Sequence, residues 1–405
     1  MQVRPDVAIV SPFPPPGRTH DGITGVAAYT ANLARALSSQ GASVAVVAPD
    51  ETKAPSSHSA DGVLVSRSGP RGPFALPRAI RMAAAMRPRV IHLQHEMFLF
   101  GGLSSIATLP KAVKLMRNHE QGAVTTVHQV VNAEQVGPEF LKMHRLRGPV
   151  AAARVAMNAY QAVLASIGPI IVHEAGFLEQ FPNAAVIPHG VEAGMRPPRE
   201  EARGRLGLAG ESRLVVLCFG FVAPYKGLEH ALAAASQAPE VFMVVAGGNH
   251  PRHGNEYAEA LQRGWGGEAR FTGWLSEEEI ARWHSAADVA LFCYPAPHSS
   301  SGAVAVALAY GTPLLASDAL ARVMGLPPEL AVSLDQGDLA EGLRRLAADR
   351  SSLAEMARAA SRMAAGRGWP QVARRHLELY DRVASGTVGE APVAIDPETD
   401  QLESV

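Results

Sequence analysis

The chain of 405 residues is 47% hydrophobic and 19% charged, a composition typical of globular proteins that excludes a disordered chain. The chain is longer than a domain with a single hydrophobic core usually is, and its length suits two α/β domains. The net charge is −1 and no aromatic residues interleave the basic ones, so nucleic-acid binding is not expected. The longest apolar run, Leu214–Ala223, is shorter than the roughly 20 residues of a membrane span, and the N-terminus lacks the apolar region of a secretion signal. We therefore expect a cytoplasmic protein.

Short apolar runs alternate with longer amphipathic ones through residues 1–190. The periodicity predicts helices over residues 25–40 and 74–87. Strands that alternate with helices imply crossover connections, and hence a parallel sheet covered on both faces. The predicted strands are VAIVS (7–11), SVAVVA (43–48), VIHLQ (90–94), AVTTV (123–127) and AVLAS (162–166).

The same half is basic, with 17 Lys and Arg against 11 Asp and Glu, whereas residues 191–405 carry 20 against 27. Two interpretations of the basic clusters stay open. They are solvated helix faces, or they are faces that touch an anionic acceptor or the anionic headgroups of the inner membrane surface. The clusters are Arg78, Arg81, Arg87 and Arg89; Lys111, Lys114 and Arg117; and Lys142, Arg145, Arg147 and Arg154.

A polar segment, residues 191–210, separates this half from a second series of strands. Its prolines, glycines and alternating charges are typical of a linker. Cys218 and Cys293 lie within the second series and read as small buried hydrophobes rather than as a disulfide or metal ligands. The predicted strands are LVVLCF (214–219), VFMVVA (241–246), ARFTG (269–273), DVALFC (288–293) and PLLAS (313–317).

These patterns predict an α/β fold of two facing Rossmann-like parallel-sheet domains, residues 1–190 and 191–369. A helix over residues 370–385 and an acidic, disordered tail over residues 386–405 follow. Parallel sheets bind ligands at the carboxyl ends of their strands, so a cleft between the two domains predicts chemistry on two substrates. No His, Asp or Glu cluster has metal-ligand spacing, so we expect no metal cofactor.

One segment with chemical potential is CFGFVAPYKGLEHALAAA, residues 218–235. A buried strand ends at Phe219, and Lys226–Gly227 is predicted to open a helix. A lysine there would lie at the mouth of the sheet beside the positive end of a helix, where a phosphate binds. The alternative is a lysine that caps neighbouring carbonyls.

A second segment, HSSSGAVAVALAYGTPLLASD (residues 298–318), places serines and Gly302 at the start of a small-residue helix. Unpaired backbone N–H groups and serine hydroxyls there favour an anion, and the glycine lets the backbone approach it closely. Simple N-capping by Ser299, Ser300 or Ser301 is the alternative. Two anion-binding turns in one domain indicate a diphosphate.

Together these motifs resemble the family-four glycosyltransferases of GT-B fold. The order IPHGVE, GFVAPYKG, VVAGGN, FTGWLSEEEI and SSSGAVAVALAYGTPLLASD is similar to the C-terminal domain of that family. The loop PPPGRTHDGITG, with the helix and strand after it, and TTVH ending at His128 resemble its N-terminal domain. The resemblance covers about residues 6–385, and it implies an acceptor domain (1–190), a nucleotide-sugar domain (191–369) and a closing helix that returns to the first.

The resemblance implies a role for particular residues. Lys226 would bind the donor diphosphate and assist catalysis, and His128 would act on the sugar or the transition state, unless it is a strand-end histidine bonded to a carbonyl. His95 and Glu96, after the strand at 90–94, are weaker candidates for acceptor contacts. The donor would also contact Gly25, Gly248, Leu275, Ser300, Ser301 and Gly302.

The sequence departs from the family at three positions. Phe221 stands where the family has an arginine, and His298 and Val306 stand where it has two glutamates. A subgroup of the family pairs PYKG with a serine-rich SSG loop, so these changes put the donor and sugar contacts in question more than the fold.

The function implied by the resemblance is a retaining glycosyltransferase that moves a sugar from a nucleoside-diphosphate sugar to a glycan, lipid-linked or small-molecule hydroxyl. The lost arginine and glutamates leave open a catalytically silent nucleotide-sugar-binding partner of another transferase. A phosphorylase or epimerase of the same fold has no distinguishing support.

Overall fold

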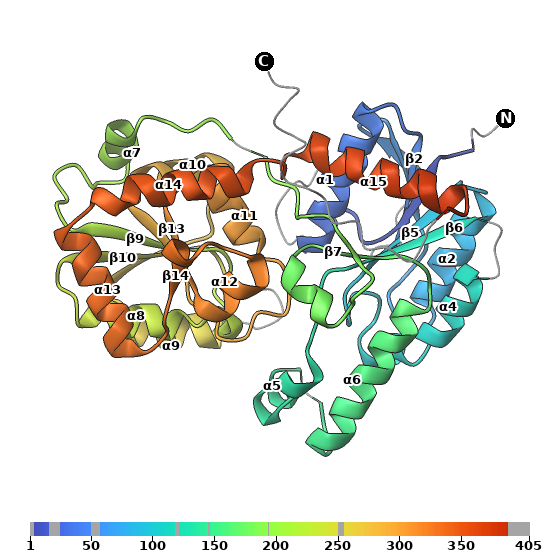
Figure 1. Cartoon of the computed structure of the whole chain (residues 1–405), viewed down its shortest axis with the longest axis horizontal. Helices are drawn as coiled ribbons and strands as arrows, with labels where there is room; N and C mark the ends of the chain where they lie inside the picture. The colour runs from blue at the N-terminus through green and yellow to red at the C-terminus, as the bar shows by residue number, and fades with distance from the viewer. Residues whose placement is uncertain are drawn as a thin grey trace. The chain divides into compact units, whose positions relative to one another are not determined.

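The computed structural model describes residues 4–15, 25–49, 57–117, 121–144, 146–192, 194–249 and 255–387. The chain forms two compact units (Figure 1). The first takes in the described residues up to Gly190, together with His298–Ser300 and the segment from Trp369; the second takes in Val191–Pro297 and Ser301–Gly368. No helix in the described part of the chain is long and apolar enough to cross a bilayer. The predicted tail lies outside the described residues from 388 onward.

The first unit is built on a sheet that has eight strands among the described residues, in the order β3-β4-β2-β1-β5-β6-β7-β8. All pairs are parallel except β3 with β4. The carboxyl ends of its central strands therefore meet at one edge. The strands are β1 (Val7–Val10), β2 (Val44–Ala48), β3 (Ser57–Ala60), β4 (Val63–Arg67), β5 (Val90–His95), β6 (Gly122–Val127), β7 (Ile170–Val172) and β8 (Ala185–Val186).

Helices cover both faces of this sheet. One core joins the sheet to α1 and α15 through residues such as Leu33 and Val372, while α2 packs on β1, β2 and β5, α4 on α2, and α6 on α4. Figure 1 shows α15 on the opposite side of the sheet from α2 and α4. The helices are α1 (Gly25–Ser39), α2 (Ala75–Ala85), α3 (Leu103–Ile106), α4 (Leu109–Arg117), α5 (Pro138–Met143), α6 (Val150–Ala165) and α15 (Trp369–Ala384), with 3₁₀ turns η1 (Ala133–Gln135) and η2 (Ala175–Glu179).

One predicted strand of this half is wrong. Residues 162–166 belong to the end of α6, and the strand is the shorter β7 that follows. The run AVLAS is apolar because one stripe of α6 is buried, and alanine favours the helix, whereas Ile170, Ile171 and Val172 are β-branched. The hairpin β3–β4 and the short strand β8 were not predicted. The other four strands are confirmed within one residue at each end.

The second unit has a parallel sheet with six strands among the described residues, in the order β11-β10-β9-β12-β13-β14. Every strand predicted from residue 214 onward is present, and only the two-residue β14 was not foreseen. Cys218 and Cys293 are buried and not joined, as predicted. The strands are β9 (Leu214–Phe219), β10 (Val241–Ala246), β11 (Ala269–Gly273), β12 (Val289–Phe292), β13 (Leu314–Ser317) and β14 (Ala331–Val332).

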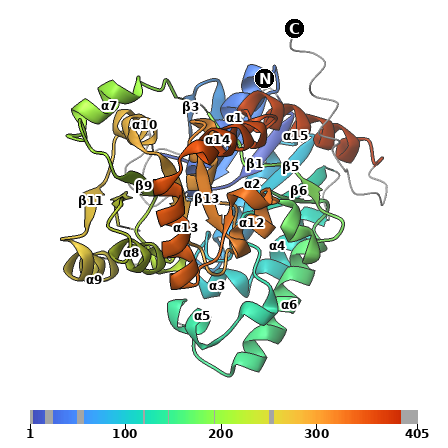
Figure 2. The same cartoon turned by 60° about the vertical axis from the view of Figure 1, so that its left-hand side comes forward.

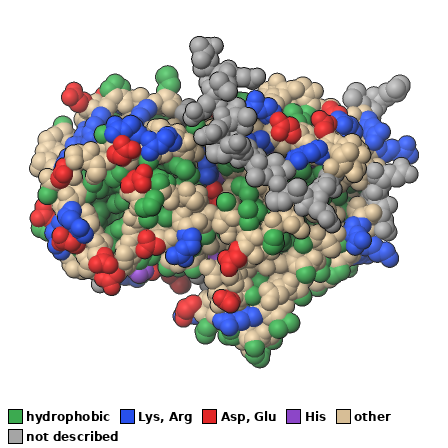
Figure 3. Space-filling view, in the orientation of Figure 1, with side chains coloured by type: hydrophobic (Ala, Val, Ile, Leu, Met, Phe, Trp, Pro, Cys, Tyr) green, Lys and Arg blue, Asp and Glu red, His purple; other side chains and the backbone are tan. Residues whose placement is uncertain are grey.

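The helices of this unit enclose the sheet, and α8 and α13 lie side by side (Figure 2). On the surface, acidic and basic side chains are interspersed over α13 and α14 (Figure 3), as ion pairs such as Glu341 with Arg344. The elements are α7 (Arg199–Arg205), α8 (Leu228–Ser236), α9 (Glu256–Trp265), α10 (Glu277–Ala286), α11 (Gly302–Ala309), α12 (Asp318–Met324), α13 (Gln336–Ala348) and α14 (Ser351–Ala364), with 3₁₀ turns η3 (Pro224–Lys226) and η4 (Pro328–Leu330).

The predicted linker, residues 191–210, is a structural part of the second unit rather than a spacer. Its helix α7 packs on α10, and the Arg199 and Arg203 guanidinium groups bond to the carboxylate of Asp288, which is only 3% exposed. Asp288 also accepts the Val215 backbone N–H at 2.7 Å. The alternating charges of this segment therefore satisfy a buried carboxylate at the start of β12.

Replacing Asp288 with alanine should lower the free energy of unfolding by about 2–4 kcal/mol. A broken buried ion pair costs about 3–5 kcal/mol, and the partly exposed guanidinium groups, which keep contact with water, reduce that figure. Urea titration of the purified variant measures the change. Glu341→Ala, which removes a surface carboxylate with two arginine partners, should leave stability nearly unchanged; equal effects from both variants would contradict the role of Asp288.

Candidate functional site

The turn after β9 places Lys226 at the carboxyl edge of the second sheet. The predicted helix does not open at Lys226: this residue closes the 3₁₀ turn η3, Gly227 follows in a left-handed conformation (φ 59°), and α8 begins at Leu228. A Cβ at Gly227 would lie 2.2 Å from the Cys293 carbonyl oxygen, so glycine is required there. The turn directs the Lys226 side chain inward, where it is only 7% exposed.

Lys226 is joined to the start of α11 by a chain of hydrogen bonds. Its Nζ donates to the Tyr294 hydroxyl, which lies 2.8 Å from Ser301 Oγ, and Ser301 Oγ accepts the Val304 N–H as the N-cap of α11. Because the lysine donates to Tyr294, the tyrosine proton is directed to Ser301, and the hydroxyl hydrogen of Ser301 is left for another acceptor. A Cβ on Gly220 would lie 2.9 Å from Nζ and 3.1 Å from the Ala303 Cβ, so the ammonium is close to the first turn of α11.

The electrostatics of Lys226 are those of a buried cation. Burial lowers the pKa of Lys226 from its usual value. Within the described part of the chain no carboxylate lies within ion-pair distance of its Nζ. The only hydrogen-bond partner of Nζ in those residues is Tyr294, which is neutral because burial raises its pKa. An anion beside α11 would therefore relieve an unfavourable buried charge.

The other predicted residues of this helix start differ in position. Gly302 is the exposed first residue of α11, with open space where a Cβ would be. Ser300 groups with the first unit and donates its hydroxyl to Glu174 Oε1 at 2.7 Å. Its hydrogen is therefore already used, unlike that of Ser301. Val306 lies half-buried within α11.

The loops after β9, β10 and β11 bring Phe221, Gly248 and Trp274 together. Leu275 points away, because its side chain is buried in the core formed with Leu217 and Val244. The neighbouring Trp274 is instead 49% exposed, and a Cβ on Gly248 would lie 2.8 Å from its ring. Phe221 lies 6.0 Å from the Trp274 ring, centroid to centroid. Trp274, rather than the side chain of Leu275, therefore lies beside Gly248.

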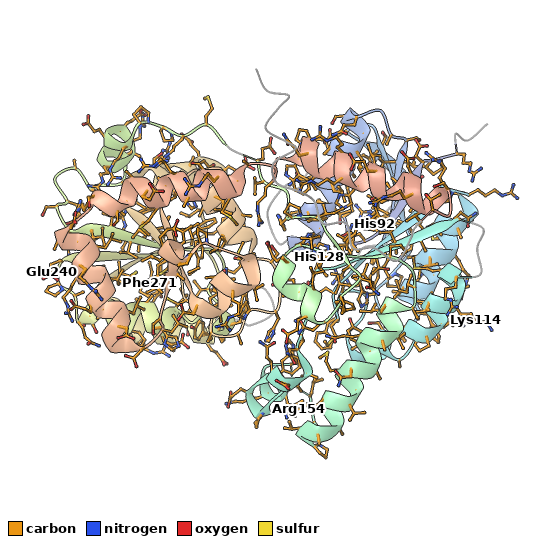
Figure 4. The ribbon with its side chains drawn as sticks, viewed as in Figure 1. His92, Lys114, His128, Arg154, Glu240 and Phe271 are labelled. Atoms are coloured by element: carbon orange, nitrogen blue, oxygen red, sulfur yellow. The ribbon has the colours of Figure 1, made fainter. Side chains whose placement is uncertain are left out.

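In the first unit, His128 follows β6 directly and both of its ring nitrogens have protein partners. Nε2 lies 2.6 Å from Gln94 Oε1, and Nδ1 lies 3.2 Å from Nε2 of His173, which follows β7. Burial, and then the nearby His173, lowers the pKa of His128 well below its usual range, so the imidazole is neutral. Figure 4 shows His128 and His92 inside this unit. Neither ring nitrogen of His128 is bonded to a backbone carbonyl, the alternative considered from the sequence. A backbone carbonyl, that of Ile187, bonds to His173.

His95 ends β5 and Glu96 follows it, and the His95 carbonyl accepts the backbone N–H of His128 at 2.9 Å. Tyr160 of α6 lies 2.6 Å from His95 Nε2, whereas His95 Nδ1 has no partner in the described residues. Burial lowers the pKa of His95 to about 4. Glu96 is half-buried, and its charge adds to the burial that raises the pKa of Tyr160.

The remaining predicted positions are only partly described. Gly25 is the exposed first residue of α1, but the glycine-rich loop before it, residues 16–24, lies outside the described residues. His298 is half-buried with its ring edge-on to Phe140 at 5.9 Å, and burial lowers its pKa. Across the described ranges no group of three or more His, Cys, Asp or Glu side chains is arranged to hold a metal.

Four side chains that the sequence did not single out shape these sites: Tyr294, Trp274, His173 and Glu174. His173 and Glu174 directly follow β7, so the misplaced strand at 162–166 hid them. Tyr294 comes two residues after a correctly predicted strand, and its place at the carboxyl edge was the available signal. Nothing in the pattern of the loop distinguished Trp274 from Leu275.

Comparisons with known proteins agree with this architecture. Sucrose-phosphate synthase from Thermosynechococcus elongatus superposes with a TM-score of 0.75 at 20% identity, over 95% of this chain and 100% of that one. HepE from Anabaena, solved in complex with UDP-glucose, superposes with a TM-score of 0.66 at 14% identity, over 93% and 99%. The protein therefore has the GT-B fold.

Sequence comparisons identify the family. The model for Glycosyltransferase Family 4 matches residues 23–193, and the model for Glycosyl transferases group 1 matches residues 199–363. The D-inositol 3-phosphate glycosyltransferase of Nocardioides sp. is 28% identical over 92% of this chain and 88% of that protein, and one from Catenulispora acidiphila is 28% identical over 94% and 96%. The chain belongs to the family-four type of GT-B glycosyltransferases, and it is a glycosyltransferase enzyme.

The buried histidines predict a loss of stability in acid. Burial lowers the pKa of His95 and His376 to about 4 and that of His284 to about 3. Below the unfolded value of about 6.5 the unfolded chain binds protons that the folded chain does not, so the free energy of unfolding should fall by up to about 1.4 kcal/mol per pH unit for each histidine.

Urea titrations at pH 7.5, 6 and 5 measure this slope. The matched variant is His376→Gln, which keeps a donor for the Val372 carbonyl but cannot titrate, and its slope should be shallower. A free energy of unfolding that stays constant between pH 7.5 and 5 would contradict the prediction.

Proposed function

We propose that the protein is a retaining glycosyltransferase that moves a sugar from a nucleoside-diphosphate sugar to an acceptor hydroxyl. The observation that supports this most is the buried ammonium of Lys226, without a carboxylate partner in the described residues and next to the Ser301-capped start of α11. Positive potential that the protein leaves uncompensated at a helix N-terminus suits the diphosphate of a donor.

In this proposal Lys226 and the start of α11 stabilise the charge that develops on the departing nucleoside diphosphate. Groups that are fixed before the reaction and shielded from water are effective at this task, because little reorganisation is needed. The acceptor hydroxyl would lose its proton with help from a donor phosphate oxygen. No metal is required by this scheme, since the ammonium and the helix start supply the positive potential.

The donor base and sugar are proposed to lie beside Gly248, with Trp274 and Phe221 in place of Leu275 and the family arginine. Aromatic faces at this edge suit a stacked base, which is uncharged, whereas the arginine would contact phosphate. HepE, of the same fold, is solved with UDP and UDP-glucose, which makes uridine donors the first to test.

The acceptor is proposed to be a glycan, lipid-linked or small-molecule hydroxyl. The names of the related D-inositol 3-phosphate glycosyltransferases add this sugar-alcohol phosphate to the compounds to be screened. His128 is proposed to contact a sugar hydroxyl and orient the reacting sugar, and His95 and Glu96 to contact the acceptor. His95 Nδ1, which is buried and has no partner in the described residues, supports such a contact.

A peripheral membrane contact is also proposed. Helix α4 packs on both α2 and α6, and the three helices contain basic residues and no acidic residue in their described ranges. Arg81, Lys111, Lys114 and Arg117 are exposed on them. Such a surface attracts anionic headgroups, by about 1 kcal/mol per basic side chain near the membrane.

Replacing Lys226 with alanine should weaken the binding of the donor nucleoside diphosphate roughly tenfold to a hundredfold. A charge-assisted hydrogen bond contributes about 1.5–3 kcal/mol net. Isothermal titration calorimetry with UDP, GDP and ADP measures the effect. Lys114→Ala removes the same charge from the exposed surface of α4 and serves as the matched control. Equal affinities for the wild type and Lys226→Ala would remove Lys226 from the site.

The same titrations should show proton uptake at alkaline pH. The free ammonium has a lowered pKa and loses its proton as pH rises through that value, while a bound diphosphate raises the pKa again. Affinity should therefore fall at high pH, and the measured enthalpy should depend on the buffer used. Lys226→Ala should lose both effects.

Replacing His128 with alanine should depress kcat by about tenfold or more with donor affinity mostly kept. The expected loss corresponds to one hydrogen bond made in the transition state. Steady-state kinetics and calorimetry on the same preparation separate the two terms. Slow donor hydrolysis by the wild type without acceptor would distinguish an enzyme from a silent donor-binding protein, and normal turnover by His128→Ala would assign His128 a structural role only.

Reversing the charge of the basic helix surface should abolish vesicle binding. Lys111→Glu with Lys114→Glu is compared with the wild type by co-sedimentation with vesicles of phosphatidylcholine containing phosphatidylglycerol. We expect wild-type binding that weakens with salt and is lost in the double variant. Absence of wild-type binding at low salt would contradict the membrane contact.

A further inference from the structure

A line of buried polar groups runs along the carboxyl edge of the first sheet, from the backbone after β8 to the interior of β5. The Ile187 carbonyl oxygen lies 2.9 Å from His173 Nδ1, His173 Nε2 lies 3.2 Å from His128 Nδ1, and His128 Nε2 lies 2.6 Å from the Gln94 side-chain amide. His173 is 2% exposed, His128 9% and Gln94 0%. The positions of the protons on these rings are therefore determined by protein groups and not by bulk water.

The carbonyl at one end fixes the order of donors and acceptors. A carbonyl oxygen only accepts, so His173 must carry a proton on Nδ1. Burial disfavours a charged ring at His173, which is 2% exposed. In the neutral ring, Nε2 has a lone pair and accepts from His128, which must then be protonated on Nδ1. A neutral His128 consequently has its lone pair on Nε2. No buried charge is needed anywhere in this arrangement.

We propose that His173 is a positioning residue that fixes His128 in the Nδ1-protonated form, so that His128 Nε2 acts as a hydrogen-bond acceptor. The structure places Gln94 Oε1 at 2.6 Å from His128 Nε2, so the amide must then be turned to present its NH₂ group instead. Oxygen and nitrogen of an amide are assigned from the hydrogen-bond network, and this network assigns them.

The rest of the line is consistent with that orientation. With the amide turned, Gln94 Oε1 faces His92, whose Nε2 lies 2.8 Å from Thr126 Oγ1 and whose Nδ1 lies 2.6 Å from the Tyr380 hydroxyl. Tyr380 then donates to His92 Nδ1, and the one proton on His92 Nε2 is shared by Thr126 Oγ1 and the turned Gln94 Oε1. The Tyr29 ring packs within 5.0 Å of His128 and His173, centroid to centroid, and holds both ring planes.

This inference rests on the proposed role of His128 and makes it more specific. The group that His128 receives through Nε2 must be a donor, which describes a sugar hydroxyl giving its hydrogen to the ring in place of the Gln94 amide. An Nε2-protonated His128 would present a donor instead and would not accept that hydrogen. The Ile187 carbonyl, acting through His173, thus determines whether His128 accepts or donates a hydrogen bond at a substrate hydroxyl.

The test is nitrogen-15 NMR of histidine-labelled full-length protein, in which protonated and unprotonated imidazole nitrogens have distinct chemical shifts. The variants are His173→Leu, which offers His128 no acceptor, and His173→Gln, which keeps one acceptor and one donor. We expect a protonated Nδ1 on His128 in the wild type and in His173→Gln, and a protonated Nε2 in His173→Leu. The kcat of His173→Leu should be about tenfold lower than that of His173→Gln, at similar donor affinity.

Gln94→Glu tests the tautomer of His128 at Nε2 rather than at Nδ1. Because glutamate has almost the same shape as glutamine, this variant keeps the test available if His173→Leu does not fold. Its carboxylate only accepts, so it should place a proton on His128 Nε2 and lower kcat. An Nε2-protonated or doubly protonated His128 in the wild type would overturn the proposal, as would a tautomer change without loss of kcat. If His128→Ala turns over normally, the proposed function of His128 fails, while the NMR result still decides whether His173 fixes its proton.

Discussion

The hydrogen bond from Lys226 to Tyr294 organises the chemistry of the second unit. A lysine that is 7% exposed and has a neutral phenol as its partner keeps its positive potential, whereas a carboxylate in the same place would cancel it. Tyr294 is also hydrogen-bonded to Ser301, so the positions of the ammonium and of the N-cap of α11 are coupled. The buried positive charge therefore stays uncompensated by the described residues, and the stability of the surrounding core offsets its unfavourable free energy.

That support comes from the parallel sheets. Each crossover returns the chain in the same direction, so residues that follow different strands gather at one edge. Tyr294 follows β12 and the Lys226 turn follows β9, and these strands are neighbours in the second sheet. His128 follows β6 and His173 follows β7, which pair in the first. At the amino edge of the second sheet, Asp288 binds the arginines of α7. The stabilising ion pairs and the candidate site therefore lie at opposite ends of the strands.

The sequence predicted the fold well because buried parallel strands are runs of β-branched residues with sharp ends. It failed at residues 162–166 because an alanine-rich helix with one buried stripe presents a similar apolar run, and only packing against α4 distinguishes the two. Lys226 and Ser301 could be singled out because glycine and serine mark the turns around them, and the structure joins them through Tyr294. Trp274 was not found, because two adjacent apolar residues in a loop differ only in which one the core takes.

The two units differ in the charge of their candidate site residues, and the proposed reaction would account for that difference. The second unit presents a cation, which suits a leaving group that becomes more negative as the glycosidic bond breaks. The first unit presents imidazoles that burial keeps neutral, such as His95 and His128. If His128 contacts the reacting sugar as proposed, a positive charge on it would disfavour the positive character that a sugar ring acquires in the transition state. A neutral ring avoids that repulsion and still accepts or donates a hydrogen bond. In the proposed function, the same burial that predicts a loss of stability in acid would also suit these histidines to contact a reacting sugar.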